Sequence, residues 1–516
     1  MDCGGGRISD RGAIFSSDGR CVLSPGGGAV HVFSRATGAR VASLKAHDDE
    51  VTTVQLDPGD PTRVYAASLD GSLSVWDYAH QKLIKKIEVS NPVCSMVIPS
   101  NGASAVLCCK TQGSKGQIVR LDLQIGRWWG AINVASPCQL VCSPSGKFFG
   151  YWLGNELWIK STNHDKEVMF VGPNPFVCVT FGSDDKRLAA GDATGRISLW
   201  NDFTPAVDKQ DHWHLKNTRT VVHWHANNNC LQSLCFSPDC VFLLSGGKEA
   251  VLVIWEVETL QKRFLARLGS TILSISVSPR DPALYVLGQD GNAIRVVNTA
   301  TDKTECSILG ISPCPRGTDG CQSTAASVIQ PGSGYLVVPT NNSVLQFYNV
   351  RRNKHVAYLQ TAPRNQVSLT EAEMDKGSNP LGPPAEPHVS ALAFNRDASV
   401  LVTVGTVPQP GPSHCVRTEL KFWDAAGHSQ EPYELNTIVN DPHGGLVSSL
   451  CYSPSDDSAV TTSSSGDFKV WHRRGCGDVT AWHCRSVGSY RGDALVVGVH
   501  IDKEGRPLIG GMYCSC

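Results

Sequence analysis

The sequence predicts an all-β protein built from repeated small sheets, and three observations support this prediction. First, apolar strands ending in a large apolar residue recur at intervals of 43, 45, 37, 42, 55, 42, 50, 76 and 48 residues, and most intervals lie near the roughly 40–50 residues of a β-propeller blade. Second, short stretches alternate apolar and polar residues between tight turns, as half-buried strands do. Third, only 18% of the 516 residues are charged, with 49 Gly and 29 Pro, which excludes a disordered, collagen-like or coiled-coil chain.

Each repeat has the same internal order. In the unit that ends at Trp255, for example, a first strand and its Ser-Pro-Asp turn occupy residues 234–239. A second strand follows at 242–247, and a third strand ends at Trp255. Period-2 strands joined by tight turns, four to a unit, are typical of a β-propeller. The ten units end at Phe33, Trp76, Leu121, Trp158, Trp200, Trp255, Val297, Phe347, Trp423 and Trp471.

Ten units exceed the four to eight blades of one ring, so we expect two propellers. Residues 1–303 are expected to form a complete N-terminal ring of about seven blades, and residues 304–476 a partial second propeller with a loop insertion at 361–388. Residues 477–516 are expected to be a divergent C-terminal tail. Because a partial ring leaves strand edges unpaired, we expect a truncated or alternatively ended form of a longer protein.

Charge and apolar pattern exclude several classes of protein. The 46 Lys and Arg balance 47 Asp and Glu, so a net charge of −1 does not indicate a general nucleic-acid or anionic-membrane binder, which leaves room for a local basic patch. No run of 18 apolar residues predicts a transmembrane helix, and the first residues lack the apolar core of a signal peptide. An intracellular protein is therefore expected.

The motifs indicate neither an enzyme nor a site for a metal or cofactor. The 20 cysteines form no Cys-x-x-Cys pair, and phosphate-loop, zinc-protease and serine-hydrolase motifs are absent. The two His-Trp-His segments, 212–214 and 223–225, are interpreted as an insertion beside a blade histidine rather than as a metal site. The short basic clusters Lys85–Lys86, 351–354 and Arg473–Arg474 are interpreted as solvated surface, with contact to RNA phosphates as the alternative.

The units resemble WD repeats, and this resemblance implies a hydrogen-bond network inside each blade. In that family a His before the first strand, a Ser or Thr, a turn Asp and the blade-end Trp are joined, because a buried indole N–H requires an acceptor. The expected network residues are His47, Ser68, Asp70 and Trp76 in the most regular unit; His225, Ser245, Glu249 (where Asp is usual) and Trp255; and His443 and Trp471, with Ser465 where Asp is usual. Trp158, Trp200 (with Thr194) and Trp423 are the other blade-end tryptophans.

Beyond the repeat pattern, the chain resembles the family of the nucleolar WD-repeat-containing protein seventy-five. Residues 69–78, 244–255 with their unusual Glu249, 267–279, 345–348, 468–471 and 487–490 carry this resemblance in order. It implies a tandem-propeller scaffold of the small-subunit processome, located in the nucleolus and supporting pre-rRNA processing and transcription by RNA polymerase I. The implied partners are other WD-repeat processome subunits, pre-rRNA and a small nucleolar ribonucleoprotein.

Two other classes of function are weighed against this one. A substrate receptor of a cullin ubiquitin ligase usually shows Trp-Asp-x-Arg at a blade end, and neither Trp76–Ala79 nor Trp423–Ala426 has the Arg. A propeller enzyme would place acids, histidines or metal ligands at the central channel, and the sequence shows no such set. The expected function is therefore a non-catalytic scaffold, with a generic WD-repeat adaptor such as a ligase receptor as the alternative.

Overall fold

The computed structural model describes residues 6–100, 102–162, 167–204, 219–222, 231–265, 268–312, 326–340, 343–362, 388–408, 416–427, 431–454, 456–476, 479–489, 495–501 and 507–512. These residues form two compact units, one spanning Gly6–Gly310 and the other beginning at Ile311. Nearly all of their regular structure is antiparallel sheet, and η1 (Gln112–Ser114) is a single 3₁₀ turn. In this part of the chain, no helix is long and apolar enough to span a membrane.

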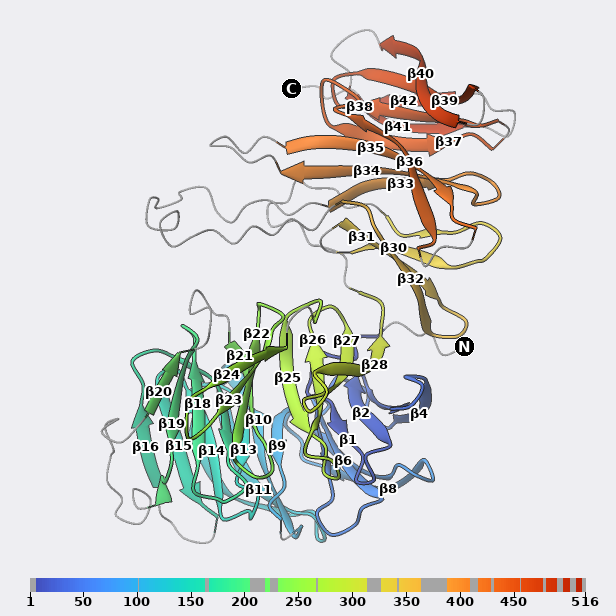
Figure 1. The fold of residues 1–516 in the computed structure, drawn as a ribbon. Coiled ribbons are helices and arrows are strands. Elements are labelled where there is room, and N and C mark those ends of the chain that lie inside the picture. Colours follow the sequence, from blue (N-terminus) through green and yellow to red (C-terminus); the bar gives the residue numbers. More distant parts are fainter. Residues whose placement is uncertain are drawn as a thin grey trace. The chain divides into compact units, whose positions relative to one another are not determined.

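The first unit consists of seven four-stranded sheets, named blades A to G in chain order (Figure 1). Blade A contains β1 (Ile14–Phe15), β2 (Cys21–Gly26), β3 (Ala29–Ser34) and β4 (Arg40–Lys45). Blade B contains β5 (Val51–Leu56), β6 (Arg63–Ser68), β7 (Ser72–Asp77) and β8 (Lys82–Glu88). Blade C contains β9 (Val93–Val97), β10 (Ser104–Lys110), β11 (Gly116–Asp122) and β12 (Trp128–Val134).

The other four blades continue the pattern without a break in order. Blade D contains β13 (Leu140–Cys142), β14 (Phe148–Leu153), β15 (Glu156–Ser161) and β16 (Glu167–Val171). Blade E contains β17 (Phe176–Phe181), β18 (Leu188–Asp192), β19 (Arg196–Trp200) and β20 (Arg219–Val222). Blade F contains β21 (Leu231–Phe236), β22 (Phe242–Gly247), β23 (Leu252–Glu256) and β24 (Lys262–Leu265). Blade G contains β25 (Ile272–Val277), β26 (Leu284–Gln289), β27 (Ala293–Asn298) and β28 (Lys303–Leu309).

Within every blade the four strands lie in the sheet in chain order, so the first and fourth strands are its edges. First strands of neighbouring blades contact one another, as β5 and β9 or β21 and β25 do. The first strands therefore surround the axis of the ring, and the fourth strands β4, β8, β12, β16, β20, β24 and β28 form its outer rim. This order is that of a β-propeller.

The core lies between the blades, and the blade-end residues fill it. Trp76 packs against Val30 and Val32 of blade A, and Trp255 packs against Ile197 and Leu199 of blade E. In each case the anchor on a third strand faces the preceding blade. An aromatic side chain buries a large apolar area, so each anchor joins two neighbouring sheets as well as stabilising its own.

Blade A closes the ring against blade G through the segment that precedes β1. The Asn292 Oδ1 accepts the Ile8 N–H at 2.7 Å, and the Asn292 Nδ2 donates to the Gly6 carbonyl at 3.2 Å. The Ser9 hydroxyl donates to the Gln289 carbonyl. Figure 1 shows β1, β2 and β4 in blue beside β25 to β28 in yellow-green. Phe15, Val22 and Phe33 of blade A share one buried cluster with Leu284, Val286, Ile294 and Val296 of blade G.

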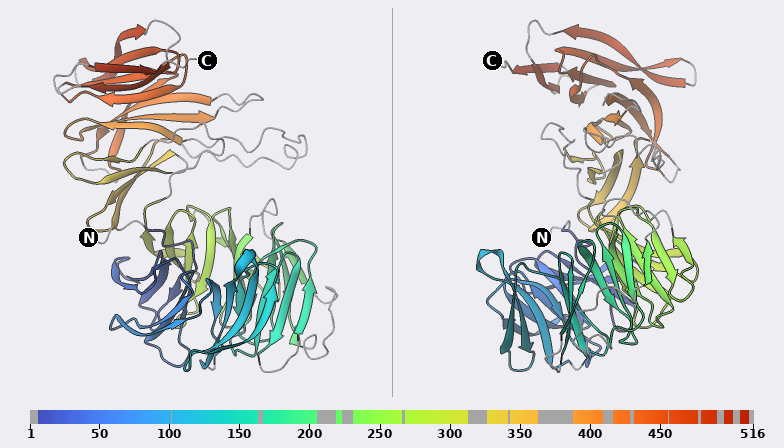
Figure 2. Two further views of the ribbon diagram at one scale, coloured as in Figure 1. Left: turned by 180° about the vertical axis from the view of Figure 1, so that it is seen from behind. Right: turned by 90° about the vertical axis from the view of Figure 1, so that its left-hand side faces the viewer.

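The second unit contains three further four-stranded sheets, blades H to J, and one pair of strands; Figure 2 shows them coloured from yellow to red. Blade H contains β29 (Val328–Ile329), β30 (Leu336–Thr340), β31 (Val344–Asn349) and β32 (Lys354–Gln360). Blade I contains β33 (His388–Phe394), β34 (Val400–Pro408), β35 (Val416–Ala425) and β36 (Tyr433–Asn440). Blade J contains β37 (Val447–Tyr452), β38 (Ser458–Ser463), β39 (Asp467–Cys476) and β40 (Val479–Ser489), and the last pair is β41 (Leu495–Ile501) with β42 (Pro507–Met512).

The prediction of an all-β fold with one ring of seven blades and a partial second propeller is confirmed. The boundaries lie elsewhere in detail. Residue 303 begins β28, which pairs with β27, and the first unit extends to Gly310. The expected tail, 477–516, contains β40, which is the fourth strand of blade J, and β41, which contacts β37 and β38. Most of the expected insertion 361–388 lies outside the described residues.

Candidate functional site

In blade B, a series of polar contacts connects the turn between β6 and β7 to the buried Trp76. The His47 Nδ1 lies 3.0 Å from the Asp70 Oδ2, and its Nε2 lies 2.7 Å from the Ser74 Oγ. The Trp76 Nε1–H donates to the same Ser74 Oγ at 3.1 Å. Because Nδ1 faces a carboxylate it carries the proton, and Nε2 then accepts the Ser74 hydroxyl proton. Trp76 thus donates to Ser74, Ser74 to His47, and His47 to the Asp70 carboxylate, so each donor has an acceptor.

The serine of this network is Ser74, whereas the sequence pattern pointed to Ser68. The Ser68 hydroxyl donates to the Asp49 carbonyl at 3.1 Å and accepts the Asp70 N–H at 3.2 Å, so it stabilises the turn. The strand register gives the reason. Ala66 on β6 pairs with Ser74 on β7, two residues before the blade-end tryptophan, so β6 has no hydroxyl at this position and β7 supplies it.

Blade J contains a second complete network. The His443 Nδ1 lies 2.6 Å from the Asp467 Oδ2, and its Nε2 lies 2.7 Å from the Thr461 Oγ1. The Trp471 Nε1–H donates to the Thr461 Oγ1 at 2.8 Å. The sequence pattern placed Ser465 at the position of the usual acid, and its hydroxyl donates to the Asp467 Oδ1 at 2.6 Å. The acid of this blade is therefore Asp467.

The turns of blades B and J thus each contain one Asp and one Ser on either side of a glycine, in opposite order. In blade B, Asp70 precedes the glycine and Ser72 follows it, with the Ser72 hydroxyl donating to the Asp70 Oδ1 at 2.7 Å. In blade J, Ser465 precedes the glycine and Asp467 follows it. The two glycines have φ of 80° and 84°, a left-handed conformation that costs glycine little. Both orders bring a carboxylate to the histidine Nδ1.

Blades F and I take the hydroxyl from their second strand. The Trp255 Nε1–H donates to the Ser245 Oγ at 2.9 Å, and the Trp423 Nε1–H donates to the Thr403 Oγ1 at 2.9 Å. Each hydroxyl residue pairs with the residue two positions before its tryptophan. Glu249 lies between β22 and β23, where the turn acid is expected. His225 lies outside the described residues, so its place in this network stays a prediction.

Blade D departs from the repeat because its anchor is displaced. Lys160 pairs with Phe149, the second residue of β14, and so occupies the position that Trp76 has in blade B. Trp158 stands two residues earlier, half-buried. Its indole stacks on Tyr151 with ring centroids 6.3 Å apart, and its Nε1–H donates to the Glu156 Oε2 at 3.3 Å. Counting from the tryptophan therefore placed the end of this unit two residues too early.

Blade E keeps a turn acid, Asp192, which no histidine of the described residues contacts. The Thr194 hydroxyl donates to the Asp192 Oδ1 at 2.7 Å, and the Asn174 Nδ2 donates to the Asp192 Oδ2 at 3.0 Å. Trp200 is 1% exposed and packs on Phe170 with ring centroids 5.1 Å apart. Within the described ranges no acceptor meets its Nε1–H. Apolar packing therefore dominates the contribution of Trp200.

The two turn carboxylates are held ionised by their hydrogen bonds. Partial burial acts to raise the pKa of Asp70, but hydrogen bonds from Ser72, the Asp48 N–H and His47 lower it to about 2. Burial likewise opposes the bonds from Ser465 and His443 that lower the pKa of Asp467 to about 2. Burial lowers the pKa of His443 below its ordinary value, against the attraction of Asp467. The turn acid is thus ionised in both blades, and in blade J the neutral form of His443 is favoured.

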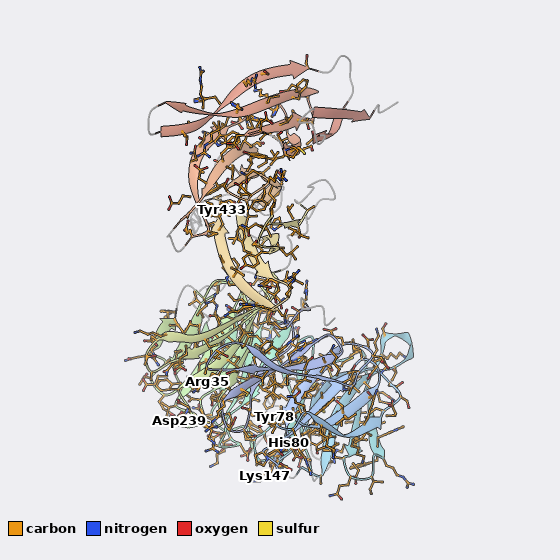
Figure 3. The ribbon with its side chains drawn as sticks, turned by 90° about the vertical axis from the view of Figure 1, so that its right-hand side faces the viewer. Arg35, Tyr78, His80, Lys147, Asp239 and Tyr433 are labelled. Atoms are coloured by element: carbon orange, nitrogen blue, oxygen red, sulfur yellow. The ribbon has the colours of Figure 1, made fainter. Side chains whose placement is uncertain are left out.

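The turns between first and second strands connect neighbouring blades at one end of the ring. Their contacts run from the Ser100 hydroxyl to the Ser145 carbonyl, from the Ser145 N–H to the Asp185 Oδ1 at 3.1 Å, from the Ser183 hydroxyl to the Pro238 carbonyl at 2.5 Å and from the Arg280 Nε to the Ser17 carbonyl at 3.4 Å. Figure 3 labels Lys147 and Asp239 on these turns, and both are exposed. The backbone of this face is thereby fixed while its charged side chains remain accessible.

Three side chains of the basic clusters noted in the sequence, those of Lys85, Lys86 and Arg473, form contacts within the protein. The Lys85 Nζ donates to the Gln124 carbonyl at 2.7 Å, and the Lys86 Nζ donates to the Ala46 carbonyl at 3.0 Å. Arg473 forms an ion pair of 3.1 Å with an aspartate. In the described ranges, no group of three or more His, Cys, Asp or Glu is arranged to hold a metal ion. The two His-Trp-His segments lie outside those ranges.

Comparison with known families finds two matches, one for each unit. The family model of the WD repeat-containing protein 75 first beta-propeller matches residues 14–124 and 159–299. The model of the WD repeat-containing protein 75 second beta-propeller matches residues 327–495. The second match includes strand β40 and the start of β41, which lie within residues 477–516, the expected tail.

Curated relatives extend the similarity over most of the chain. WD repeat-containing protein 75 of Danio rerio is 28% identical over 495 residues, covering 91% of this chain and 56% of the relative. That of Mus musculus is 28% identical over 522 residues, covering 95% of this chain and 58% of the relative. U3 small nucleolar RNA-associated protein 17 of Schizosaccharomyces pombe is 26% identical over 307 residues, 55% of this chain and 36% of the relative. The chain thus spans little more than half the length of the two WD repeat-containing protein 75 relatives and about a third of the third relative.

Proposed function

The chain belongs to the WD repeat-containing protein 75 family, and from this premise we propose that it is a non-catalytic scaffold in ribosome biogenesis. The proposed assembly is the small-subunit processome, where the chain supports pre-rRNA processing and transcription by RNA polymerase I. The observation that carries this proposal is the similarity over 307 residues to a protein named for its association with the U3 small nucleolar RNA.

The buried hydrogen-bond networks of the blades support a scaffold role. The buried polar groups of blades B and J hydrogen-bond to one another, from the indoles of Trp76 and Trp471 to the carboxylates of Asp70 and Asp467. Satisfied buried networks stabilise and specify a structure. A ring stabilised in this way presents its turns and outer rim as fixed surfaces for partners.

The proposed partners are other WD-repeat processome subunits, pre-rRNA and the small nucleolar ribonucleoprotein, and the proposed location is the nucleolus. Two relatives carry names that favour this assignment, one associated with U3 small nucleolar RNA and one, of Saccharomyces cerevisiae, called NET1-associated nuclear protein 1. Propellers bind partners through loops and rims that differ between families, so the shared family supports a shared assembly more than the fold does.

Affinity purification of the tagged full chain from nuclear extract tests the proposal. We expect U3 RNA, pre-rRNA and processome subunits to be enriched over the tag alone. The matched control is the Ser74→Ala, Ala66→Ser double variant, which retains the polar groups of blade B and is expected to recover the same particles. Recovery of a cullin adaptor in place of these components would overturn the proposal.

The ligase-receptor alternative finds no support in the blade-end turn. The Asp77 carboxylate accepts the N–H groups of Ala79 and His80 at 3.1 Å each, and it lies 2.8 Å from the His80 Nδ1. Asp77 therefore caps the turn between β7 and β8. Ala79 stands where a ligase receptor would present an arginine.

A further inference from the structure

The outer edge of blade C exposes two adjacent tryptophans. Trp128 is 55% exposed and Trp129 is 46% exposed, both at the start of β12, and Ile125 in the preceding turn is 69% exposed. Indoles are costly to leave in water, and exposed aromatic groups commonly mark binding surfaces. The contrast with Trp76 and Trp255, which fill interfaces between blades, shows that these two indoles do not serve the core of the ring.

The two indoles lie on opposite faces of the edge strand. Trp128 pairs with Leu121, which packs towards blade B, and Trp129 pairs with Arg120, whose guanidinium donates to the Thr162 carbonyl of blade D at 2.7 Å. Since side chains of paired residues share a face of the sheet, the indoles flank the edge of β12 from both sides. A ligand that crosses this edge can contact both rings.

This part of the ring is basic, although the whole chain is not. Residues 82–138 contain seven Lys and Arg but only two acidic residues, against a net charge of −1 for the chain. Arg127 is exposed directly beside Trp128, and within the described residues no carboxylate lies at ion-pair distance from it. Lys85 of β8 reaches the turn before β12 through its bond to the Gln124 carbonyl. The two exposed indoles therefore lie close to the positive charges of Arg127 and Lys85.

We propose that this surface, formed by Lys85, Ile125, Arg127, Trp128 and Trp129 and called the blade C edge, binds single-stranded RNA. Bases stack on exposed aromatic rings regardless of sequence, and neighbouring cations neutralise the phosphates. The proposed function identifies the nucleic acid as RNA, and the inference rests on it in that respect. A ribosome-assembly scaffold would then contact its RNA directly through this ring.

The backbone of β12 disfavours the main competing occupant, an extended peptide added as a fifth strand. Between the pairs Ile118–Ile132 and Arg120–Trp129, β12 has one extra residue, and Gly130 adopts φ of 64°. A bulge interrupts the row of N–H and C=O groups that an added strand needs, and edge strands commonly use bulges to prevent such pairing. Stacking on side chains needs no such row.

Blade F offers a matched comparison on the same rim. Its outer strand β24 carries Lys262, Arg263 and the 39% exposed Phe264, so it too combines basic and aromatic side chains. There, however, Arg263 forms an ion pair of 3.0 Å with Asp302, and the Lys262 Nζ lies 5.8 Å from the centre of the Phe264 ring. The arginine of β24 is thus paired with a carboxylate, whereas among the described residues Arg127 has no such partner, so we expect no RNA binding on β24.

The test is fluorescence anisotropy of a labelled 20-nucleotide uridine-rich RNA with the purified full chain, at two or more salt concentrations. We expect binding that the Trp128→Ala, Trp129→Ala double variant weakens at least about tenfold, as loss of base stacking does. Arg127→Ala should weaken binding and reduce the salt dependence by about one ion. The Arg263→Ala, Phe264→Ala variant is the control and should bind as the unchanged chain does. Circular dichroism verifies that each variant is folded.

The outcomes separate this inference from the proposed function. No RNA binding, or equal binding by the double variant, overturns the blade C edge as an RNA site even if processome particles are recovered from extract. In the purification from extract, a partner protein can remain bound after ribonuclease treatment and be lost only from the edge variant. This result also overturns the inference, because the blade C edge would then bind that protein and not RNA. RNA binding at the edge without recovery of processome particles supports the RNA site and counts against the proposed assembly alone.

Discussion

Ala66 and Ser74 face each other across β6 and β7, and this pair decides which strand of blade B supplies the buried hydroxyl. The Ser74 Oγ lies 3.1 Å from the Trp76 Nε1 and 2.7 Å from the His47 Nε2. In blade F the corresponding hydroxyl belongs to Ser245, on the strand that holds Ala66 in blade B. The hydroxyl thus occupies the same position beside the tryptophan in blades B and F, although it comes from the third strand in blade B and from the second strand in blade F.

Ser74→Ala is expected to destabilise the ring by about 1–3 kcal/mol, because it leaves a buried indole N–H without an acceptor. Adding Ala66→Ser should restore much of the loss, since the new hydroxyl extends from the facing residue. Urea unfolding monitored by tryptophan fluorescence measures both changes. If the double variant were as unstable as the single one, a hydroxyl on β6 could not replace the hydroxyl on β7. The statement that either strand can supply it would then be wrong.

A second exchange is testable in blade J. Asp467→Ser alone removes the carboxylate 2.6 Å from the His443 Nδ1, and we expect a loss of about 1–3 kcal/mol because the buried imidazole loses a charged acceptor. Ser465→Asp added to it recreates the order found in blade B and should recover stability. The Ser465→Asp single variant is the control. Recovery is measured as the shift of the thermal unfolding midpoint, and its absence would show that the two turn orders are not equivalent.

The repeat of the sequence sufficed to predict the blades, because apolar strands and their turns recur with the spacing of the sheets. Inside the blades the sequence pattern was less reliable. Ser68 and Ser74 both carry hydroxyl groups near Trp76, and the register places Ser74 opposite Ala66, beside the tryptophan. Alternation along a strand places residues 74 and 76 on one face, and this signal could have identified Ser74.

The blade D anchor was missed for a different physical reason. Leu153 and Glu156 pair directly, so two residues form its turn, whereas the last pair in blade B, Ala67–Leu73, encloses five. Trp158 therefore falls nearer to the turn than a count of residues suggests. Turn length is set by local backbone geometry, which the spacing of tryptophans does not record.

Acid is expected to weaken the protein in two stages. As the pH falls below 6.5, the unfolded chain protonates His443 before the folded chain does, because burial lowers the folded pKa, so stability decreases. As the pH falls from 3.8 towards about 2, the stability contributed by ionised Asp70 and Asp467 is lost, because their folded pKa values lie below the unfolded one.

Urea unfolding midpoints measured from pH 8 to pH 3 test this expectation. His443→Gln should flatten the first decline, and His80→Gln, which changes a histidine whose side chain is 78% exposed, serves as the control. Asp467→Asn should reduce the second decline. A first decline that His443→Gln leaves unchanged would assign the titration to another group.

Asn292→Ala is expected to loosen ring closure, because the Ile8 N–H loses its acceptor. An unsatisfied buried N–H costs about 1–3 kcal/mol. Asn133→Ala is the control, since that side chain makes only an exposed contact with Gln117 and should change stability by less than about 0.5 kcal/mol. Hydrogen exchange should accelerate at residues 6–12 in the first variant alone. Unchanged protection there would show that the apolar cluster between blades A and G closes the ring without the amide.

The displaced anchor of blade D predicts unequal roles for two tryptophans that the repeat pattern treats alike. Trp76 is 7% exposed between blades A and B, so Trp76→Ala should cost about 3–5 kcal/mol through lost burial and the cavity left behind. Trp158 is half-buried and already two residues from the blade-end position, so Trp158→Ala should cost only about 1–2 kcal/mol. Guanidinium unfolding of both variants measures the difference. Equal losses would mean that Trp158 anchors its blade despite the register, and that Lys160 at the blade end contributes little to the interface.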